Sequence, residues 1–170
     1  IIIICLPTPL GKNREPNLSS INFFMEKAIK YFKKEQLIIF ESTTYPGTTK
    51  EFIIDKLKKN NFKIGKNIYV GYSPERIDPG RNIKTDEITK IYSGYSKNCK
   101  KLIKNFYNKL FINTHEIKNI ETCELTKLYE NIYRNVNIGL VNEMKIISDV
   151  LGAPQIGNEN TKILLKSVLS

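Results

Sequence analysis

The alternation of short apolar runs with longer amphipathic segments is the feature that most constrains the fold of this chain. Buried strands are predicted at Ile1–Leu6, Leu37–Phe40 and Lys66–Tyr72, and two more at Lys90–Tyr95 and Phe111–Thr114. The first run is short, rich in β-branched residues and ended by prolines, which is typical of a buried strand. Helices between such strands cover both faces of a parallel sheet, so the expected fold class is α/β.

Three helices are expected between these strands. The first covers about Ser19–Lys34, where apolar residues recur at helical spacing and one of the first two serines can cap the helix. The second follows the hydroxyl-rich turn Ser42–Thr49 and ends near Lys59. A basic third helix is predicted over about Ser96–Leu110.

A different pattern begins at about Asn119, where apolar residues repeat every three or four positions as far as Val150. One helix of this length would measure about 45 Å at 1.5 Å per residue, which is too long for a helix that covers a sheet. We interpret it as a spine that links domains or forms a dimer contact, and Gly152 can end it. The expected division is a sheet domain over 1–117, the long helix over 118–152 and a divergent tail over 153–170.

The chain has 170 residues and a formal net charge of +10, a balance that can indicate nucleic-acid or membrane contact. Its lysines are scattered over the whole length, however, and no aromatic-basic interleaving or known nucleic-acid motif accompanies them. We therefore expect no nucleic-acid partner, and a phosphate-bearing small molecule is the anion that best suits the charge. The sequence also lacks a long uncharged apolar stretch, so no membrane partner is expected.

Three cysteines and one histidine limit the chemistry that is available. Cys5, Cys99 and Cys123 form no CxxC pair, so neither a zinc site nor a disulfide framework is predicted, and no metal is expected. Sparse cysteines fit a reducing cytoplasm. His115 has no acid or nucleophile pattern beside it, so we interpret it as structural and expect no histidine-based triad.

Ligands of parallel α/β folds bind where the carboxyl ends of the strands meet. The loops Pro7–Pro9, Ser42–Thr44 and Ser73–Arg76 follow the first three predicted strands and thus lie at this edge. Their hydroxyls can donate to phosphate or ribose oxygens, but they can equally cap turns and helices. Glu75 can act as a base or activate water, with an ordinary turn carboxylate as the alternative. No segment reads GxGxxG, so the sequence shows no dinucleotide fingerprint.

Two further sets of side chains can hold an oxygen-bearing ligand. Lys127 and Asn131 are four residues apart on the long helix, so they share a face and can stabilise charge on a substrate oxygen. The alternative is a solvated stripe in which Glu124 pairs with Lys127. Arg76 and Arg81 can pair with phosphate, although neither is diagnostic by itself.

Four segments occur in order and at fitting distances along most of residues 1–152. They are Ile4–Leu10, Glu41–Thr49, Tyr72-Ser-Pro-Glu-Arg-Ile-Asp-Pro-Gly80 and Glu124–Glu143. Together they resemble the UDP-glucose/GDP-mannose dehydrogenase family. The third segment is most similar to the branch that oxidises UDP-N-acetylhexosamines such as UDP-N-acetylglucosamine.

This resemblance implies a fold and an activity. The expected fold is a partial Rossmann-like parallel sheet followed by a long central helix used for dimerisation, with a C-terminal domain that binds the UDP-sugar. The implied reaction oxidises the C6 alcohol of the sugar to a carboxylate with two NAD, in the supply of polysaccharide or glycan precursors. NAD is thus the expected cofactor, a UDP-sugar the substrate and a second copy of the chain the partner.

The resemblance also assigns a cofactor role to individual positions. Thr8 and Thr43 match threonines that line the NAD site, and Pro7 and Ser42 beside them are grouped with the same site. Thr43 is in addition expected near the reacting centre, so it is counted among the catalytic residues.

Substrate and catalytic roles carry over in the same way. Glu75 matches the glutamate that assists hydrolysis of the thioester intermediate. Lys127 and Asn131 match the pair that binds the C6 oxygen, which agrees with their helical spacing. Arg76 completes the expected substrate contacts.

Several features of the family are missing from the sequence. The glycine-rich turn is expected before Ile1, and the nucleophilic cysteine is expected well after the central helix, in a setting that none of the three cysteines has. A second glutamate of the UDP-glucose enzymes falls at Pro79, and Ala153–Ser170 does not resemble the family's continuation. We therefore expect an internal, incomplete and inactive part of such an enzyme. The alternatives are a non-catalytic dimerisation or interaction remnant, and a basic nucleic-acid binder.

Overall fold

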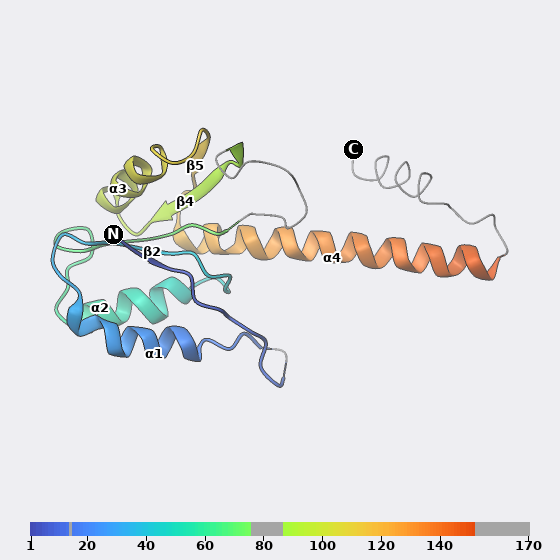
Figure 1. Cartoon of the computed structure of the whole chain (residues 1–170), viewed down its shortest axis with the longest axis horizontal. Coiled ribbons are helices and arrows are strands. Elements are labelled where there is room, and N and C mark those ends of the chain that lie inside the picture. The colour runs from blue at the N-terminus through green and yellow to red at the C-terminus, as the bar shows by residue number, and fades with distance from the viewer. Residues whose placement is uncertain (14, 76–86, 152–170) are drawn as a thin grey trace. The chain divides into compact units, whose positions relative to one another are not determined.

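The computed structural model describes residues 1–13, 15–75 and 87–151 of the chain. Figure 1 shows helices on both sides of a sheet, followed by one long helix. In chain order the elements are β1 (Ile2–Ile4), α1 (Ser19–Ala28), η1 (Ile29–Tyr31), β2 (Leu37–Phe40), η2 (Thr49–Ile54), α2 (Asp55–Lys59), β3 (Tyr69–Tyr72), β4 (Lys90–Gly94), α3 (Lys97–Tyr107), β5 (Thr114–Glu116) and α4 (Ile120–Val150). The chain is divided into two compact units, of which the first covers Ile1–Tyr129 and the second begins at Glu130.

The five described strands form one sheet in the order β1-β2-β3-β4-β5. β1, β2 and β3 are parallel, with Ile38 of β2 opposite Ile2 and Val70. β4 and β5 are also parallel to each other. The expected α/β fold class is confirmed, and so is the long helix that follows the sheet in the sequence.

The expectation that every strand would be parallel is wrong for one pairing, because β4 runs antiparallel to β3. A parallel neighbour needs a crossover connection, usually a helix, whereas an antiparallel neighbour does not. Residues 73–89 contain Pro74, Pro79 and Gly80 and show no helical spacing of apolar residues. β4 therefore begins at the edge of the sheet where β1, β2 and β3 end.

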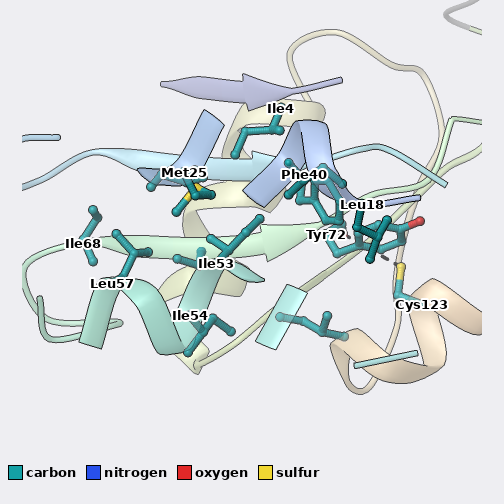
Figure 2. Close-up of a cluster of buried hydrophobic side chains, with 14 of the residues drawn as sticks. Ile4, Leu18, Met25, Phe40, Ile53, Ile54, Leu57, Ile68, Tyr72 and Cys123 are labelled. Carbon is teal, nitrogen blue, oxygen red and sulfur yellow. Dashed lines mark hydrogen bonds between the residues drawn. The ribbon is translucent and has the colours of Figure 1, made fainter. Parts of the chain in front are cut away.

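Both faces of the sheet are buried, because successive side chains of a strand point to opposite sides. On one face, Ile38 and Phe40 of β2 pack in the larger core with residues of α1, η2 and α2. Figure 2 shows Phe40 and Tyr72 pointing into this core together with Met25 and Ile53. On the other face, the alternate residues of β2 pack with α3 in a smaller core of Leu37, Ile39, Tyr92, Ile103 and Tyr107.

The first strand is less buried than the sequence predicted. Instead of a fully buried strand over Ile1–Leu6, β1 covers Ile2–Ile4 at one end of the described sheet order. Ile4 is buried on the face of α1 and α2, whereas Ile3 on the opposite face is 43% exposed. The core on that opposite face is formed by β2, β4 and α3, and it does not include Ile3.

Other elements differ from the prediction at their ends. The first helix is α-helical over Ser19–Ala28 and continues as a short 3₁₀ turn, and the second begins as a π-helical segment, η2, before α2. The last strand was predicted at Phe111–Thr114 but lies at Thr114–Glu116. The amide of Phe111 still donates to the carbonyl of Tyr107 at 2.9 Å. Phe111 therefore belongs to the turn that follows α3, and the strand begins three residues later than predicted.

The long helix is present as α4, whose 31 residues agree with the predicted Asn119–Val150. Apolar side chains that defined its periodicity are exposed over most of its length: Leu125, Ile132, Val136, Leu140, Met144 and Ile147. In the part of the chain that the structure describes, no helix is both long and apolar enough to cross a membrane.

Candidate functional site

The loops that follow β1 and β2 are fastened to each other at the carboxyl ends of these strands. The hydroxyl of Thr8 donates to the carbonyl of Thr43 at 2.7 Å, and the hydroxyl of Ser42 donates to the carbonyl of Leu6 at 2.6 Å. Thr43 itself is exposed. The structure therefore brings together the two loops in which the sequence placed the cofactor contacts Pro7, Thr8, Ser42 and Thr43.

The end of β3 joins the same edge. The amide of Ser73 donates to the carbonyl of Phe40 at 3.0 Å, and the hydroxyl of Tyr72 donates to the carbonyl of Ser42 at 3.2 Å. Burial of the Tyr72 ring raises the pKa of its hydroxyl, which therefore stays protonated and able to donate. Glu75 follows two residues after Ser73 and is exposed.

A buried cation lies at this edge that the sequence did not reveal. Lys90 is only 4% exposed, and its Nζ lies 3.0 Å from Oε1 of Glu41 and 3.5 Å from Oε2 of Glu75. Lys90 is the first residue of β4, and the antiparallel direction of β4 brings it to the ends of β2 and β3. Lysines are mostly exposed in folded proteins, and a lysine at the first position of a strand is no exception. The sequence around Lys90 therefore did not predict that its side chain is buried.

Glu41 is the centre of this charged cluster. It accepts hydrogen bonds from the hydroxyl of Tyr107 and, at 3.6 Å, from the thiol of Cys5. The ammonium of Lys90 also lies 5.2 Å from the centre of the Tyr107 ring, within cation–π range. Burial raises the pKa of the Cys5 thiol, and the negative charge of Glu41 raises it further. The cluster thus holds a positive charge beside the Glu75 carboxylate.

The helix α4 carries the remaining predicted substrate residues. Lys127 is half-buried in the first unit, and Asn131, one helical turn further on, is half-buried at the start of the second. Arg76, the other predicted substrate contact, lies outside the described residues, as do Arg81 and Pro79.

Glu124 is buried and not exposed, in contrast to the alternative in which it pairs with Lys127 on a solvated face of the helix. Its side chain is fully buried, and its carboxylate accepts hydrogen bonds from Gly47 in the loop after β2 and from Thr49 at the start of η2, instead of lying in a solvated stripe with Lys127. The i,i+3 spacing from Lys127 could not show that Gly47 and Thr49 supply donors to this carboxylate.

The three cysteines differ in their surroundings. Cys99 and Cys123 are buried, while Cys5 is exposed. Burial raises the pKa of the Cys123 thiol to about 12, so this thiol stays protonated near neutral pH. Within residues 1–13, 15–75 and 87–151, no three His, Cys, Asp or Glu side chains are grouped so that they could hold a metal ion.

A mostly parallel sheet with helices on both faces and hydroxyl-bearing loops at its carboxyl edge defines a Rossmann-type nucleotide-binding domain. The model of the UDP-glucose/GDP-mannose dehydrogenase family, NAD binding domain, matches residues 1–111. The chain belongs to this family of nucleotide-sugar dehydrogenases, and its cofactor is NAD.

Individual relatives agree with this assignment. Protein CapL of Staphylococcus aureus is 38% identical over 153 residues, which are 88% of this chain and 36% of that protein. A UDP-N-acetyl-D-glucosamine 6-dehydrogenase of Pseudomonas aeruginosa is 34% identical, over 89% of this chain and 37% of its own length. The solved UDP-N-acetyl-mannosamine dehydrogenase Cap5O of S. aureus matches with a TM-score of 0.78 and 33% identity, over 88% of this chain and 37% of that one. The chain therefore spans little more than a third of the length of each of these three relatives.

Proposed function

We propose that this chain is the NAD-binding part of an enzyme that oxidises the C6 alcohol of a UDP-N-acetylhexosamine to the uronic acid. The observation that carries this proposal is the meeting of the Thr8 and Thr43 loops with the end of β3, which leads to Glu75. The loops that carry the proposed cofactor contacts thus lie at the same edge of the sheet as the strand end that precedes Glu75, which supports the proposal. Relatives named for UDP-N-acetyl-D-glucosamine and for UDP-N-acetyl-D-mannosamine support the N-acetylhexosamine class.

In this proposal the loops after β1 and β2 hold NAD through Pro7, Thr8, Ser42 and Thr43. The fit is chemical: phosphate and ribose oxygens need donors, and the exposed hydroxyl of Thr43 at a strand's carboxyl end supplies one. Bound NAD would accept hydride from the sugar. Thr8 and Ser42 use their hydroxyls to fix the two loops, so their proposed contribution is the shape of the site.

Glu75, Lys127 and Asn131 are the proposed catalytic groups for the sugar. The ammonium of Lys127 and the amide of Asn131 would donate to the C6 oxygen and stabilise negative charge on it. The Glu75 carboxylate would position or activate the water that hydrolyses the acyl intermediate. Arg76 is proposed to contact the substrate as well.

The isolated chain is proposed to be inactive in the complete oxidation. The covalent step needs a reactive thiolate, and the Cys123 thiol is buried while the Cys5 pKa is raised. No GxGxxG segment occurs in the 170 residues to cradle the pyrophosphate. In the whole enzyme, α4 is proposed to form a homodimer contact in the cytoplasm, where the nucleotide sugar would be supplied.

The direct test is NADH formation from UDP-N-acetylglucosamine and UDP-N-acetylmannosamine by the 170-residue chain. We expect no turnover above the rate without protein. Sustained turnover would contradict the proposed incompleteness. The non-catalytic remnant predicts a dimer with no NAD affinity, so light scattering combined with an NAD titration separates that alternative from the enzyme part.

A further inference from the structure

Glu124 is a buried carboxylate that joins the start of α4 to a distant loop. Its Oε1 accepts from the amide and the hydroxyl of Thr49 at 2.7 and 2.6 Å, and its Oε2 accepts from the amide of Gly47 at 2.6 Å. These hydrogen bonds span more than seventy residues of sequence, and the side chain has no exposed surface. A buried charge costs free energy unless it is fully hydrogen-bonded, so this carboxylate is held in one place.

Two of the three donors belong to Thr49, the first residue of the helical segment formed by η2 and α2, and the third is the amide of Gly47, two residues before it. The first amides of a helix have no partner within the helix, and Thr48 at this N-terminus makes no side-chain capping bond. Glu124 fills that role from another element, where its negative charge also suits the helix dipole. Gly47 has a φ of +99°, a left-handed conformation that favours glycine and turns its amide to the carboxylate.

The same loop carries the proposed cofactor contact. Thr43 precedes Gly47 by four residues, and its carbonyl is fastened to Thr8. On the other side, Lys127 follows Glu124 by three residues on α4, within one helical turn. Hydrogen bonds at Thr43 and at Gly47, joined by the four-residue stretch of backbone between them, therefore connect Thr8 to the helix that bears Lys127.

We propose that Glu124 is a positioning residue that couples the NAD-side loop to the substrate-side turn of α4. The assignment of NAD to the Thr43 loop and of substrate to Lys127 rests on the proposed function. The hydrogen bonds that join the loop to α4 through Glu124 do not depend on it. If NAD restricts the motion of the Thr43 loop, the hydrogen bonds of Glu124 would also restrict the motion of the α4 turn that bears Lys127.

Hydrogen exchange and chemical shifts of the full chain, measured by NMR, test the link. Glu124→Gln keeps the shape of the side chain but places an amide donor against a backbone donor. We expect exchange at Gly47 and Thr49 to accelerate by about tenfold or more, as for the loss of a charge-assisted hydrogen bond. Exchange at Lys127 should accelerate as well, while Ile39 in β2 should not change.

The functional arm compares the response to NAD. In the unchanged chain, NAD should shift the amide of Thr43 and also that of Lys127, whereas in Glu124→Gln it should shift Thr43 alone. Glu121→Gln is the matched control, because Glu121 is an exposed carboxylate one turn earlier on the same helix, and it should behave as the unchanged chain.

Thr49→Val removes one hydroxyl donor and spares both backbone donors, so it tests the link if the glutamine variant does not fold. It should accelerate exchange at Gly47 and Lys127 in the same direction but by less. Faster exchange at the loop with no change at Lys127 would overturn the proposal. An unchanged chain in which NAD shifts no residue would instead contradict the proposed function, and the exchange measurements would still decide the link.

Discussion

At the scale of single residues, the candidate site contains two buried side chains that can carry opposite charges, Lys90 and Glu124, and each is held by a different kind of partner. Lys90 is held by carboxylates and aromatic rings at the carboxyl edge of the sheet, and Glu124 is held by backbone and hydroxyl donors. Neither role follows from sequence spacing, because each depends on partners tens of residues away. Thr8, Thr43 and Glu75, by contrast, were predicted to share an edge from their positions after apolar runs, and the described loops support that placement.

Replacing Lys90 by methionine should destabilise the first unit strongly. The change removes the ammonium that pairs with the largely buried Glu41 carboxylate, and removing one partner of a buried ion pair costs roughly 3–5 kcal/mol. Urea unfolding at neutral pH measures this loss. Lys100→Met is the matched control, because Lys100 pairs with Glu116 near the surface and such pairs are worth about 0–1 kcal/mol. Equal losses in both variants would show that the Lys90 cluster is not a buried ion network.

Glu124 should make the stability of the fold depend on pH. Burial raises the pKa of its carboxyl against the opposing effect of the Thr49 and Gly47 donors, and Glu121 adds a small repulsion. A carboxyl with a raised folded pKa stabilises the fold fully below its ordinary pKa of about 4.3 and loses that contribution as pH rises through the raised value.

The unfolding free energy of the unchanged chain minus that of Glu124→Gln should therefore fall as pH rises across this window. Tyr72 and Cys123 also lie close, but both remain protonated there, since the pKa of each is raised. A difference that instead grows with pH would mean that the three donors outweigh burial.

At the scale of elements, most of the fold could be predicted and the exceptions have identifiable causes. Five strands and the four main helices were expected from apolar periodicity, which is a local signal. The direction of β4 was missed, because strand direction depends on the connection and not on the strand's own residues. The π-helical start of the second helix, η2, was missed as well, because apolar periodicity in a short segment does not separate a π-helical turn from an α-helical one.

Close packing of β3 against β4 and α3 makes Gly71 a sensitive position. A Cβ there would lie 2.0 Å from a methyl group of Ile103 and 2.4 Å from the carbonyl of Ser93. Because the backbone carbonyl cannot move aside easily, Gly71→Ala should cost about 1–3 kcal/mol, as overpacking does, in thermal or urea unfolding. Gly139→Ala in α4 meets no atom within 4 Å and should instead stabilise that helix, by up to about 1 kcal/mol. A neutral Gly71→Ala variant would contradict the packing of β3 on α3.

At the scale of the whole molecule, α4 exposes a row of large apolar side chains over several turns, which is unusual for a solvated helix. The proposed homodimer would bury this row.

Light scattering should therefore give twice the mass of one chain. Val136→Glu combined with Met144→Glu should shift the mass towards that of a monomer, since both side chains are exposed on this row and a buried carboxylate there would be unpaired. Asn142→Glu adds charge at an exposed polar position of the same helix and should leave the dimer intact. A monomeric mass for the unchanged chain would count against the dimer contact.

The carboxyl edge of β1, β2 and β3 is proposed to be the NAD side of the domain. An NAD titration of the isotope-labelled chain, followed through its backbone amides, tests it most directly. We expect saturable shifts centred on Thr8, Thr43 and Ser73, with weak affinity because no GxGxxG segment occurs in the 170 residues. Shifts centred on the opposite ends of these strands, or no saturable shift at high NAD concentration, would contradict it.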